Sequence, residues 1–581
     1  MAPMAFSPLH CLIFWLLLVH LAGSVAIPPP SGPSNQQHEQ EPSKAAYIVY
    51  TNHVAKPSHF ATHEHWYTSM VASLSPSAAN SSSRVFYTYD TVAHGFAAEL
   101  TSDEAQRLSN TTGVAGVFED GVMHLHTTRS PGFLGLDKEF GILPDANFGD
   151  DVIIGFVDTG IWPESASFLD AGLSPVRRSW KGRCEDGERF NATMCNNKLV
   201  GARFFPYMGT RAAKKRSDYY YYYVDFQSPR DKLGHGTHVA STAAGAEVAG
   251  AELFRFAGGT ARGVAPRARV AVYKACDADP AKDCSTSSVV AAIDAAVKDG
   301  VDILSISLGD SEDDLYTHPP SVALFGAVRA GVFVACSAGN AGPEASSLSN
   351  VAPWITTVGA TNLDRVFPAT ITLGNGQALT GQSLYPYTAK GTQRVRLVPS
   401  HCNSSMSEFV PDRIMGSIVV CTGLFRVGLL TGIAVQSAGG SGLVSISTED
   451  WGMEGLAVDA FTLPAITLGA REAVKLEAYM HSDPYPVASF CFTCRTAVGE
   501  TRAPMVASYS SRGANHIVRE IMKPDVVAPG TNILAAWPDE TPLSEDTGDV
   551  DPRRESFNII FGTSMSCPHV AGVAALLRNR H

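Results

Sequence analysis

The amino-acid sequence predicts a doubly wound α/β domain with a parallel sheet, preceded by a small ferredoxin-like unit and interrupted by a β-rich insertion. Short apolar strands alternate with helical segments along much of the 581-residue chain, as in a sheet with crossover helices. The alternation stops between about residues 367 and 494, where several short strands are separated by Gly and Pro. We therefore expect three structural parts.

The small unit follows from the pattern between residues 45 and 126. Its strands and helices are expected in the order β-α-β-β-α-β, which is the order of a ferredoxin-like fold. Strands are expected at 46–50, 84–89, 96–100 and 116–119, with helices at 59–74 and from 102.

The large domain is predicted from buried apolar strands separated by helical segments. Strands are expected at 151–157, 269–273, 301–306 and 332–335, and helices at 235–244, 287–298 and 320–329. The α/β pattern resumes at 503–530 and leads into a helix that begins near Ser564. In such sheets, functional residues collect at the carboxyl ends of the strands.

Composition and charge exclude several classes of protein. Hydrophobic residues make up 45% and charged residues 17%, which indicates a globular rather than a disordered chain. The net charge of −12 argues against a nucleic-acid partner. The basic cluster at 211–216, followed by tyrosines at 219–223, is interpreted as an exposed loop.

The N-terminus predicts a secreted protein. An apolar run at 11–19 is followed by small residues that end at Ala26, which is the pattern of a signal peptide over residues 1–26. The run is too short to favour a membrane anchor. Residues 27–44, rich in Pro, Ser, Gln and Glu, predict a linker.

Ten cysteines remain once Cys11 leaves with the signal peptide, and an oxidising compartment favours disulfides. Candidate bridges by local spacing are Cys184/Cys195, Cys276/Cys284 and Cys402/Cys421, although connectivity does not follow from sequence. A structural bridge is favoured for Cys491 and Cys494 over a redox or zinc motif, whereas Cys336 and Cys567 are expected to be free. Expected glycosylation sites begin at Asn80, Asn110, Asn191 and Asn403.

Three polar residues occupy positions suited to acyl transfer. Asp158 ends a buried strand, while His235 and Ser564 each begin a helix. Taken singly, an Asp after a strand is usually a turn former and a His before a helix an ordinary polar residue. Together they supply an orienting acid, a base and a nucleophile. The G-x-S-x-G elbow of α/β-hydrolases is missing around Ser564.

The segments around these residues resemble the motifs of subtilisin-like serine proteases, and most closely the plant subtilase branch. The motifs are 157–165, 234–238, 337–342 and 561–570, in the family's order. The resemblance implies a catalytic triad of Asp158, His235 and Ser564, with Asn340 in the oxyanion hole. His238 would then be a structural neighbour of the catalytic histidine.

The resemblance also implies how substrate binds and how the enzyme matures. The implied substrate-binding residues are Ser307, Leu308, Gly309, Ser337, Ala338 and Gly339. Plain glycine turns are the alternative for both segments. Residues 45–126 resemble an inhibitory propeptide, with self-cleavage between His126 and Thr127. This propeptide contains seven histidines, whose protonation would release it; surface decoration is the alternative.

The remaining expectations concern domains, partners and competence. The catalytic domain is expected at 127–366 and 495–581, split by a protease-associated domain at 367–494 that is a candidate homodimer contact. We expect protein or peptide substrates, inhibition by the chain's own propeptide, and no metal or catalytic cofactor. For a plant protein, secretion leads to the apoplast or cell wall.

The resemblance also exposes a weak point at the C-terminus. Plant subtilases continue past the serine helix into a fibronectin-like domain, whereas this chain ends at His581. A truncated form, with a frayed serine helix, is therefore expected. The alternative function is a catalytically incompetent secreted homologue that only binds peptides or partners.

Overall fold

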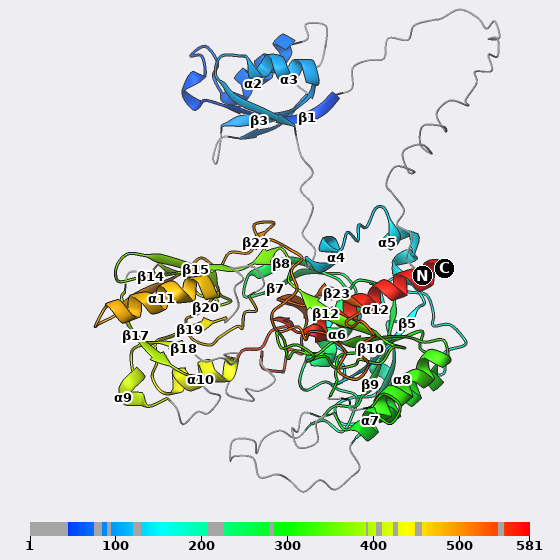
Figure 1. The fold of residues 1–581 in the computed structure, drawn as a ribbon. Coiled ribbons are helices and arrows are strands. Elements are labelled where there is room, and N and C mark those ends of the chain that lie inside the picture. The colour runs from blue at the N-terminus through cyan, green and yellow to red at the C-terminus, as the bar shows by residue number, and fades with distance from the viewer. Residues whose placement is uncertain are drawn as a thin grey trace, which may run out of the picture. The chain divides into compact units, whose positions relative to one another are not determined.

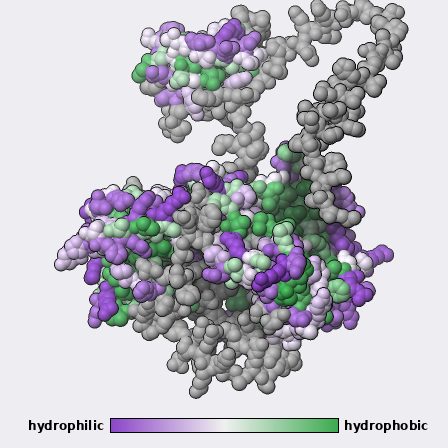
Figure 2. Space-filling model, in the orientation of Figure 1, coloured by the Kyte–Doolittle hydropathy of each residue, from purple (hydrophilic) through white to green (hydrophobic). Residues whose placement is uncertain are grey.

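We analysed a computed structural model of the chain. The structure describes residues 44–74, 84–89, 94–119, 129–206, 225–277, 284–310, 312, 314–390, 393–402, 409–421, 428–447, 456–543 and 551–581. Contacts divide the chain into two compact units, residues 1–124 and 125–581, shown as a ribbon in Figure 1. On both units, hydrophilic surface alternates with hydrophobic patches (Figure 2).

The first unit has the predicted β-α-β-β-α-β order. Its sheet is antiparallel, with strand order β2-β3-β1-β4. The elements are β1 (Lys44–Thr51), α2 (His63–Leu74), β2 (Val85–Tyr89), β3 (Gly95–Thr101), α3 (Ser102–Ser109) and β4 (Val114–Glu119). Both helices bury apolar residues in one core, which includes Trp66, Phe96 and Leu108. The ferredoxin-like prediction is confirmed.

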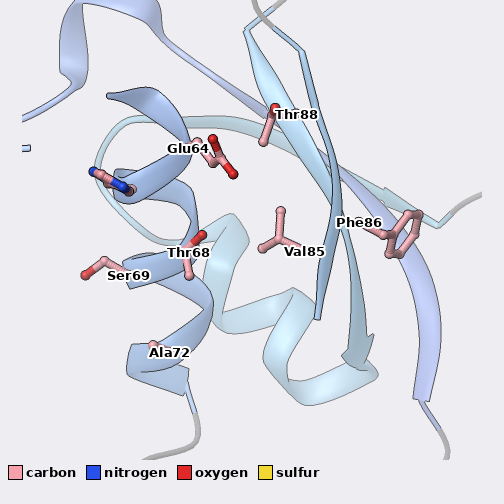
Figure 3. Close-up of a pocket in the computed structure, with 8 residues that line it drawn as sticks. Glu64, Thr68, Ser69, Ala72, Val85, Phe86 and Thr88 are labelled. Atoms are coloured by element: carbon pink, nitrogen blue, oxygen red, sulfur yellow. The ribbon is translucent and has the colours of Figure 1, made fainter. Parts of the chain in front are cut away.

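A surface hollow of about 560 Å³ lies in this first unit, between α2 and the edge strand β2. In Figure 3, Glu64 and Thr68 on the helix and Val85 and Phe86 on the strand are among the residues that line the hollow. None of the residues that the sequence assigned to catalysis lines this hollow.

The second unit contains, within the described residues, a sheet of seven parallel strands in the order β23-β12-β11-β10-β5-β9-β6. The strands are β5 (Ile153–Asp158), β6 (Leu199–Phe204), β9 (Arg269–Lys274), β10 (Ile303–Ile306), β11 (Phe333–Ser337), β12 (Thr356–Thr361) and β23 (Val526–Pro529). The parallel sheet is confirmed, although β6 and β12 were not foreseen. Strands β6 and β9 lie on one side of β5, whereas the later strands β10, β11, β12 and β23 lie on its other side. The order of strand addition therefore reverses between β5 and β10.

Helices cover both faces of this sheet (Figure 1). One core joins α6 (His235–Ala244) and α12 (Thr563–Arg580), through residues such as Val239, Ala243 and Ala571. A second core joins the other face to α7 (Thr286–Asp299) and α8 (Pro319–Arg329). The two helices that begin at His235 and beside Ser564 therefore pack side by side.

The expectation of a frayed serine helix is wrong. Helix α12 continues to Arg580, and Asn579 donates to the carbonyl of Asp150 at 2.6 Å. Arg580 forms an ion pair with Asp145 at 2.5 Å. Polar contacts to the main domain therefore hold the last turn.

The segment between Phe367 and Cys494 forms a second sheet that closes on itself, because β14 pairs with both β15 and β21. Its strands are β14 (Pro368–Leu373), β15 (Ala378–Gln382), β16 (Ala389–Lys390), β17 (Val395–Ser400), β18 (Ile418–Cys421), β19 (Gly442–Ile446), β20 (Ala465–Leu468) and β21 (Val487–Phe492). This segment also contains three helices that were not predicted from the sequence: α9 (Pro411–Ile414), α10 (Leu429–Ser437) and α11 (Ala470–Ser482).

Three antiparallel strand pairs and short N-terminal helices complete the second unit. The pairs are β7 (Val248–Leu253) with β8 (Phe256–Ala261), β13 (Arg365–Val366) with β22 (Ala497–Val498), and β24 (Ile533–Ala536) with β25 (Phe557–Ile560). The short helices are α4 (Ser130–Phe133) and α5 (Ile142–Asp145). Trp537 follows β24 and is fully buried in a core with β7 and β8.

The three disulfides that local spacing suggested are present: Cys184–Cys195, Cys276–Cys284 and Cys402–Cys421. Cys336 and Cys567 are free and buried, as expected. The bridge between Cys491 and Cys494 is wrong, because both thiols are free. Cys491 lies in the extended strand β21, while the Cys494 thiol is directed to the carbonyl of Tyr385 at 3.7 Å.

No helix among the described residues is long and apolar enough to cross a membrane. The expected signal peptide, linker residues 27–43 and the basic cluster at 211–216 lie outside the described residues, as do Asn80, Asn403, His126 and Thr127, whereas Lys44, the last residue of the predicted linker, begins β1. Asn110 and Asn191 are described and exposed, as glycosylation would require.

Candidate active site

The candidate site lies where parallel strands of the large sheet end. Asp158 is the last residue of β5, Ser307 directly follows β10, and Ser337 ends β11. These three strands are neighbours, and the winding changes direction between β5 and β10. Because parallel strands place their carboxyl ends at one edge, the fold gathers the predicted residues there.

Asp158 and His235 form a direct hydrogen bond. His235 Nδ1 lies 2.7 Å from Asp158 Oδ1, and the side chains are 20% and 3% exposed, respectively. The backbone N–H of Thr159 donates to the same carboxylate oxygen at 2.8 Å. A carboxylate partner makes Nδ1 the protonated nitrogen, so that Nε2 presents a lone pair and can act as a base.

His235 is the first residue of α6, and its helix begins without a side-chain cap. The preceding residue, Gly234, has φ of +97°, a left-handed conformation that favours glycine. A Cβ at that position would lie 2.7 Å from the Trp537 ring, so the space is also closed to larger residues. The start of the helix, and with it the imidazole, is therefore fixed by a tight turn.

Ser564 is the second residue of α12 and is half-buried. Its hydroxyl donates to the carbonyl of Ser307 at 3.1 Å, and the Ser307 hydroxyl donates to the carbonyl of Ser564 at 2.8 Å. This reciprocal pair ties the serine to the end of β10. The first backbone N–H groups of a helix lack intrahelical acceptors and favour negative charge beside them.

Asn340 lies directly beside the start of the serine helix. Its side-chain oxygen accepts from the Thr563 backbone N–H at 2.9 Å and from the Thr563 hydroxyl at 3.0 Å. Because the amide oxygen is used in this way, the amide NH₂ group is left to donate elsewhere. A Cβ on Gly562 would lie 3.3 Å from that nitrogen, which places the donor beside the serine turn.

Asn350, which the sequence did not predict as a site residue, connects the two predicted substrate-binding segments by hydrogen bonds. Asn350 Nδ2 donates to the carbonyl of Leu308 at 3.0 Å and to the carbonyl of Ser337 at 2.8 Å. Gly309 is exposed and Gly339 half-buried. Asn350 lies in a segment without a recognisable motif, so local sequence gave no signal for its role.

Three of the predicted substrate-binding residues are buried rather than exposed. Ser307 is 6% exposed, Ser337 4% and Ala338 0%. The backbone N–H of Ala338 donates to Val358 at 2.9 Å, and its carbonyl accepts from Ser349. Their side chains therefore support the segments from within.

His238 lies one turn after His235 and is fully buried. Its Nε2 contacts the carbonyl of Ile533 at 3.0 Å, and its ring lies edge-on to Trp537. Burial, with a smaller contribution from the nearby His235, lowers the pKa of His238 to about 3. A permanently neutral imidazole that bridges α6 to β24 fits the expected structural role.

The described residues contain no group of three or more His, Cys, Asp or Glu side chains arranged to hold a metal ion. Burial also raises the pKa of the Cys567 thiol, on the serine helix, to about 11. This cysteine is therefore a thiol rather than a reactive thiolate at neutral pH.

Comparison with known proteins identifies the family. The family model described as "Subtilase family" matches residues 149–581, and the model "Peptidase inhibitor I9" matches residues 46–126. The chain belongs to the subtilase family. It is a serine-type endopeptidase with an I9 inhibitor domain, which makes it a zymogen.

Several relatives of this subtilase are plant proteases. Subtilisin-like protease SBT1.7 of Arabidopsis thaliana is 45% identical over 550 residues, covering 93% of this chain and 70% of that relative. Subtilisin-like protease SBT1.6 of the same plant is 45% identical over 90% of this chain and 68% of its own length. Subtilisin-like protease SBT3 of Solanum lycopersicum is 37% identical over 99% and 72%, respectively.

Among solved structures, the psychrophilic subtilisin-like protease Apa1 from Pseudoalteromonas sp. AS-11 is 18% identical to this subtilase. The match covers 78% of this chain and 88% of that chain, with a TM-score of 0.33. The family assignment depends on the sequence models and the plant relatives.

Proposed function

We propose that this subtilase hydrolyses peptide bonds through a triad of Asp158, His235 and Ser564. The observation that supports this proposal most is the 2.7 Å hydrogen bond between His235 and Asp158 at the head of α6. That helix packs beside α12, which carries Ser564 in its first turn. Acid, imidazole and hydroxyl thus belong to one edge of one sheet.

The reaction proceeds by attack of Ser564 Oγ on the substrate carbonyl. The hydroxyl rotates away from the Ser307 carbonyl and passes its proton to Nε2 of His235. Asp158 holds the imidazole tautomer and stabilises its positive form. His235 then gives the proton to the leaving amine, an acyl-enzyme forms on Ser564, and water completes hydrolysis by the same route.

Negative charge on the substrate oxygen is stabilised by two donors. The side-chain NH₂ of Asn340 is free to point toward the oxyanion, because its oxygen is held by Thr563. The backbone N–H of Ser564 belongs to the first turn of α12 and carries the positive end of the helix dipole. Donors fixed in advance in this way lower the barrier without reorganising during the reaction.

Substrate binds in an extended conformation along Ser307–Gly309 and Ser337–Gly339. The backbone of the first segment pairs with the peptide as an added strand. Exposed Gly309 leaves the edge accessible, and Asn350 keeps the two segments together. The buried Ser337 and Ala338 support the wall of the pocket from behind.

Maturation begins with removal of residues 1–26 on secretion and continues with self-cleavage between His126 and Thr127. The I9 match over residues 46–126 supports this boundary. The closed sheet supports the assignment of residues 367–494 as a protease-associated domain that divides the catalytic domain into 127–366 and 495–581. This domain is also our candidate for a homodimer contact.

A serine-directed fluorophosphonate probe tests the proposed nucleophile. Wild-type protein should be labelled on Ser564, and Ser564→Ala should lose both the label and the activity on a peptide substrate. Ser566→Ala is the matched control, because its fully buried hydroxyl donates to the carbonyl of Ala528. Labelling that persists in Ser564→Ala would contradict the proposal, and a wild type without label or activity would favour a homologue that only binds peptides.

A further inference from the structure

Asp231 is a fully buried carboxylate surrounded by hydrogen-bond donors. Its Oδ1 accepts from Thr159 Oγ1 at 3.0 Å, Leu233 N at 3.1 Å and Gly234 N at 2.8 Å. Its Oδ2 accepts from the backbone N–H of Thr237 at 2.9 Å and from the Thr237 hydroxyl at 2.6 Å. All five partners donate, so the site requires a group that only accepts, which a carboxylate is.

These donors flank both members of the Asp158–His235 pair. Thr159 directly follows Asp158, whereas Gly234 directly precedes His235. The Thr159 hydroxyl also accepts from the backbone N–H of Gly236 at 2.8 Å, on the other side of the histidine. One buried side chain therefore connects the end of β5 to the first turn of α6, independently of the Asp158–His235 hydrogen bond.

Asp231 also replaces the missing cap of α6. Gly234 has no side chain to accept from the first turn, whereas Oδ2 of Asp231 accepts from Thr237, the third residue of the helix. The positive end of a helix disfavours a positive charge, and His235 takes up a proton there during turnover. A carboxylate at this helix end offsets that effect.

The surrounding backbone leaves little room for adjustment. The Asp231 backbone N–H donates to the carbonyl of Ile161 at 3.0 Å, in the loop after Asp158. Gly160 has φ of +117°, and a Cβ there would lie 2.5 Å from the carbonyl of Pro229 and 3.0 Å from Asp231 N. Side chain and backbone thus fix Asp231 to the same loop.

We propose that Asp231 is a positioning residue for peptide hydrolysis. Its carboxylate holds His235 in register with Asp158 and stabilises the positive charge that the imidazole acquires in the reaction. This inference rests on the proposed triad. Asp231 acts on it indirectly, through hydrogen bonds to Thr159, Gly234 and Thr237.

The test compares Asp231→Asn, Thr159→Val and wild type on a peptide substrate, with rates corrected for active sites counted by fluorophosphonate labelling. In Asp231→Asn, kcat should fall on the order of 10- to 100-fold with little change in KM, since misplaced reacting groups act on the chemical step. The acidic limb of kcat/KM against pH should move to lower pH, because removing a negative charge disfavours the imidazolium.

Thr159→Val separates the two roles of Asp231. This substitution breaks the link to Asp231 and Gly236 but keeps the negative charge, so kcat should fall while the acidic limb stays in place. Asp299→Asn is the matched control. Asp299 is also buried and bonded to Tyr273 and Arg203, but it lies at the end of α7 on the opposite face of the sheet. Its kcat and pH profile should equal those of wild type.

An Asp231→Asn enzyme with wild-type kcat, or with lowered kcat and an unshifted acidic limb, overturns the proposal. If that variant fails to fold, Thr159→Val decides, and an unchanged kcat there is equally contrary. Failure of the proposed triad has a different signature, since Ser564→Ala would then be as active as wild type.

Discussion

The buried histidines of the catalytic domain should make its stability depend on pH. Burial lowers the pKa of His238 to about 3 and that of His569 to about 4, from the ordinary value of 6.5. Both are neutral in the folded protein but take up a proton when the chain unfolds below pH 6.5. Above pH 7 these histidines therefore do not change the free energy of unfolding. As the pH falls toward 3 to 4, they lower it by a growing amount.

The magnitude follows from the size of the pKa shift. For His238, linkage gives a loss of roughly 2 kcal/mol at pH 5 and roughly 3 kcal/mol at pH 4, relative to pH 7. Replacing His238 by Gln removes the titration but keeps an N–H donor for the carbonyl of Ile533. The variant will be less stable at pH 7, because the packing against Trp537 changes. As the pH is lowered, the free energy of unfolding of the variant should nevertheless decrease less steeply than that of its parent.

The assay is guanidinium denaturation at pH 7, 6, 5 and 4, with every protein carrying Ser564→Ala to prevent self-digestion. When the pH is lowered from 7 to 5, the midpoint of the catalytic-domain transition should fall less in His238→Gln than in its parent. The difference between the two decreases should be equivalent to roughly 2 kcal/mol of unfolding free energy. His481→Gln is the control, because His481 is exposed on α11 and should leave the dependence unchanged. An identical pH dependence in His238→Gln and its parent would refute the assignment of a neutral buried imidazole.

Two further predictions concern catalysis and maturation. Asn340→Ala should lower kcat by about 10²- to 10³-fold with little effect on KM, measured by steady-state kinetics with active-site titration. A raised KM with an unchanged kcat would contradict the assignment of Asn340 to the oxyanion hole. Release of the cleaved propeptide should accelerate between pH 7 and 5, because imidazoles ordinarily become charged in this range and the propeptide contains seven histidines. A release rate that is flat over this range, followed by size-exclusion chromatography, would leave these histidines without that role.

The sequence predicted the location of the candidate site because strand ends and helix starts are local features. Asp158 follows a continuous apolar run, and His235 begins a segment with helical spacing, so their approach follows from the geometry of a parallel sheet. The first unit was predictable for the same reason. Its strands and helices are short and regular, and Thr101 with Glu104 forms a capping box at the start of α3.

The supporting residues could not be predicted, because their partners are distant in sequence. Asn350 reaches back 42 residues to Leu308, and Asp231 reaches back 72 residues to Thr159. An Asn or Asp in a loop is usually a turn former, and only tertiary packing turns it into a buried acceptor or donor. Helices α10 and α11 were missed because glycines and short strands around them suggested a wholly β segment.

Cysteine pairing shows the same limit. Local spacing found three bridges correctly, but it also suggested one between Cys491 and Cys494. The direction in which each thiol points is set by the strand and its neighbours, which spacing does not report.

The most direct test of the central claim is the N-terminus of the secreted protein. Wild type and Ser564→Ala should be expressed in the same secretory host and their N-termini determined by mass spectrometry. If Asp158, His235 and Ser564 form a working triad that processes its own propeptide, only wild type will begin at Thr127, and Ser564→Ala will retain residues up to His126. The same processed N-terminus in both proteins, or an uncleaved propeptide in both, would contradict it.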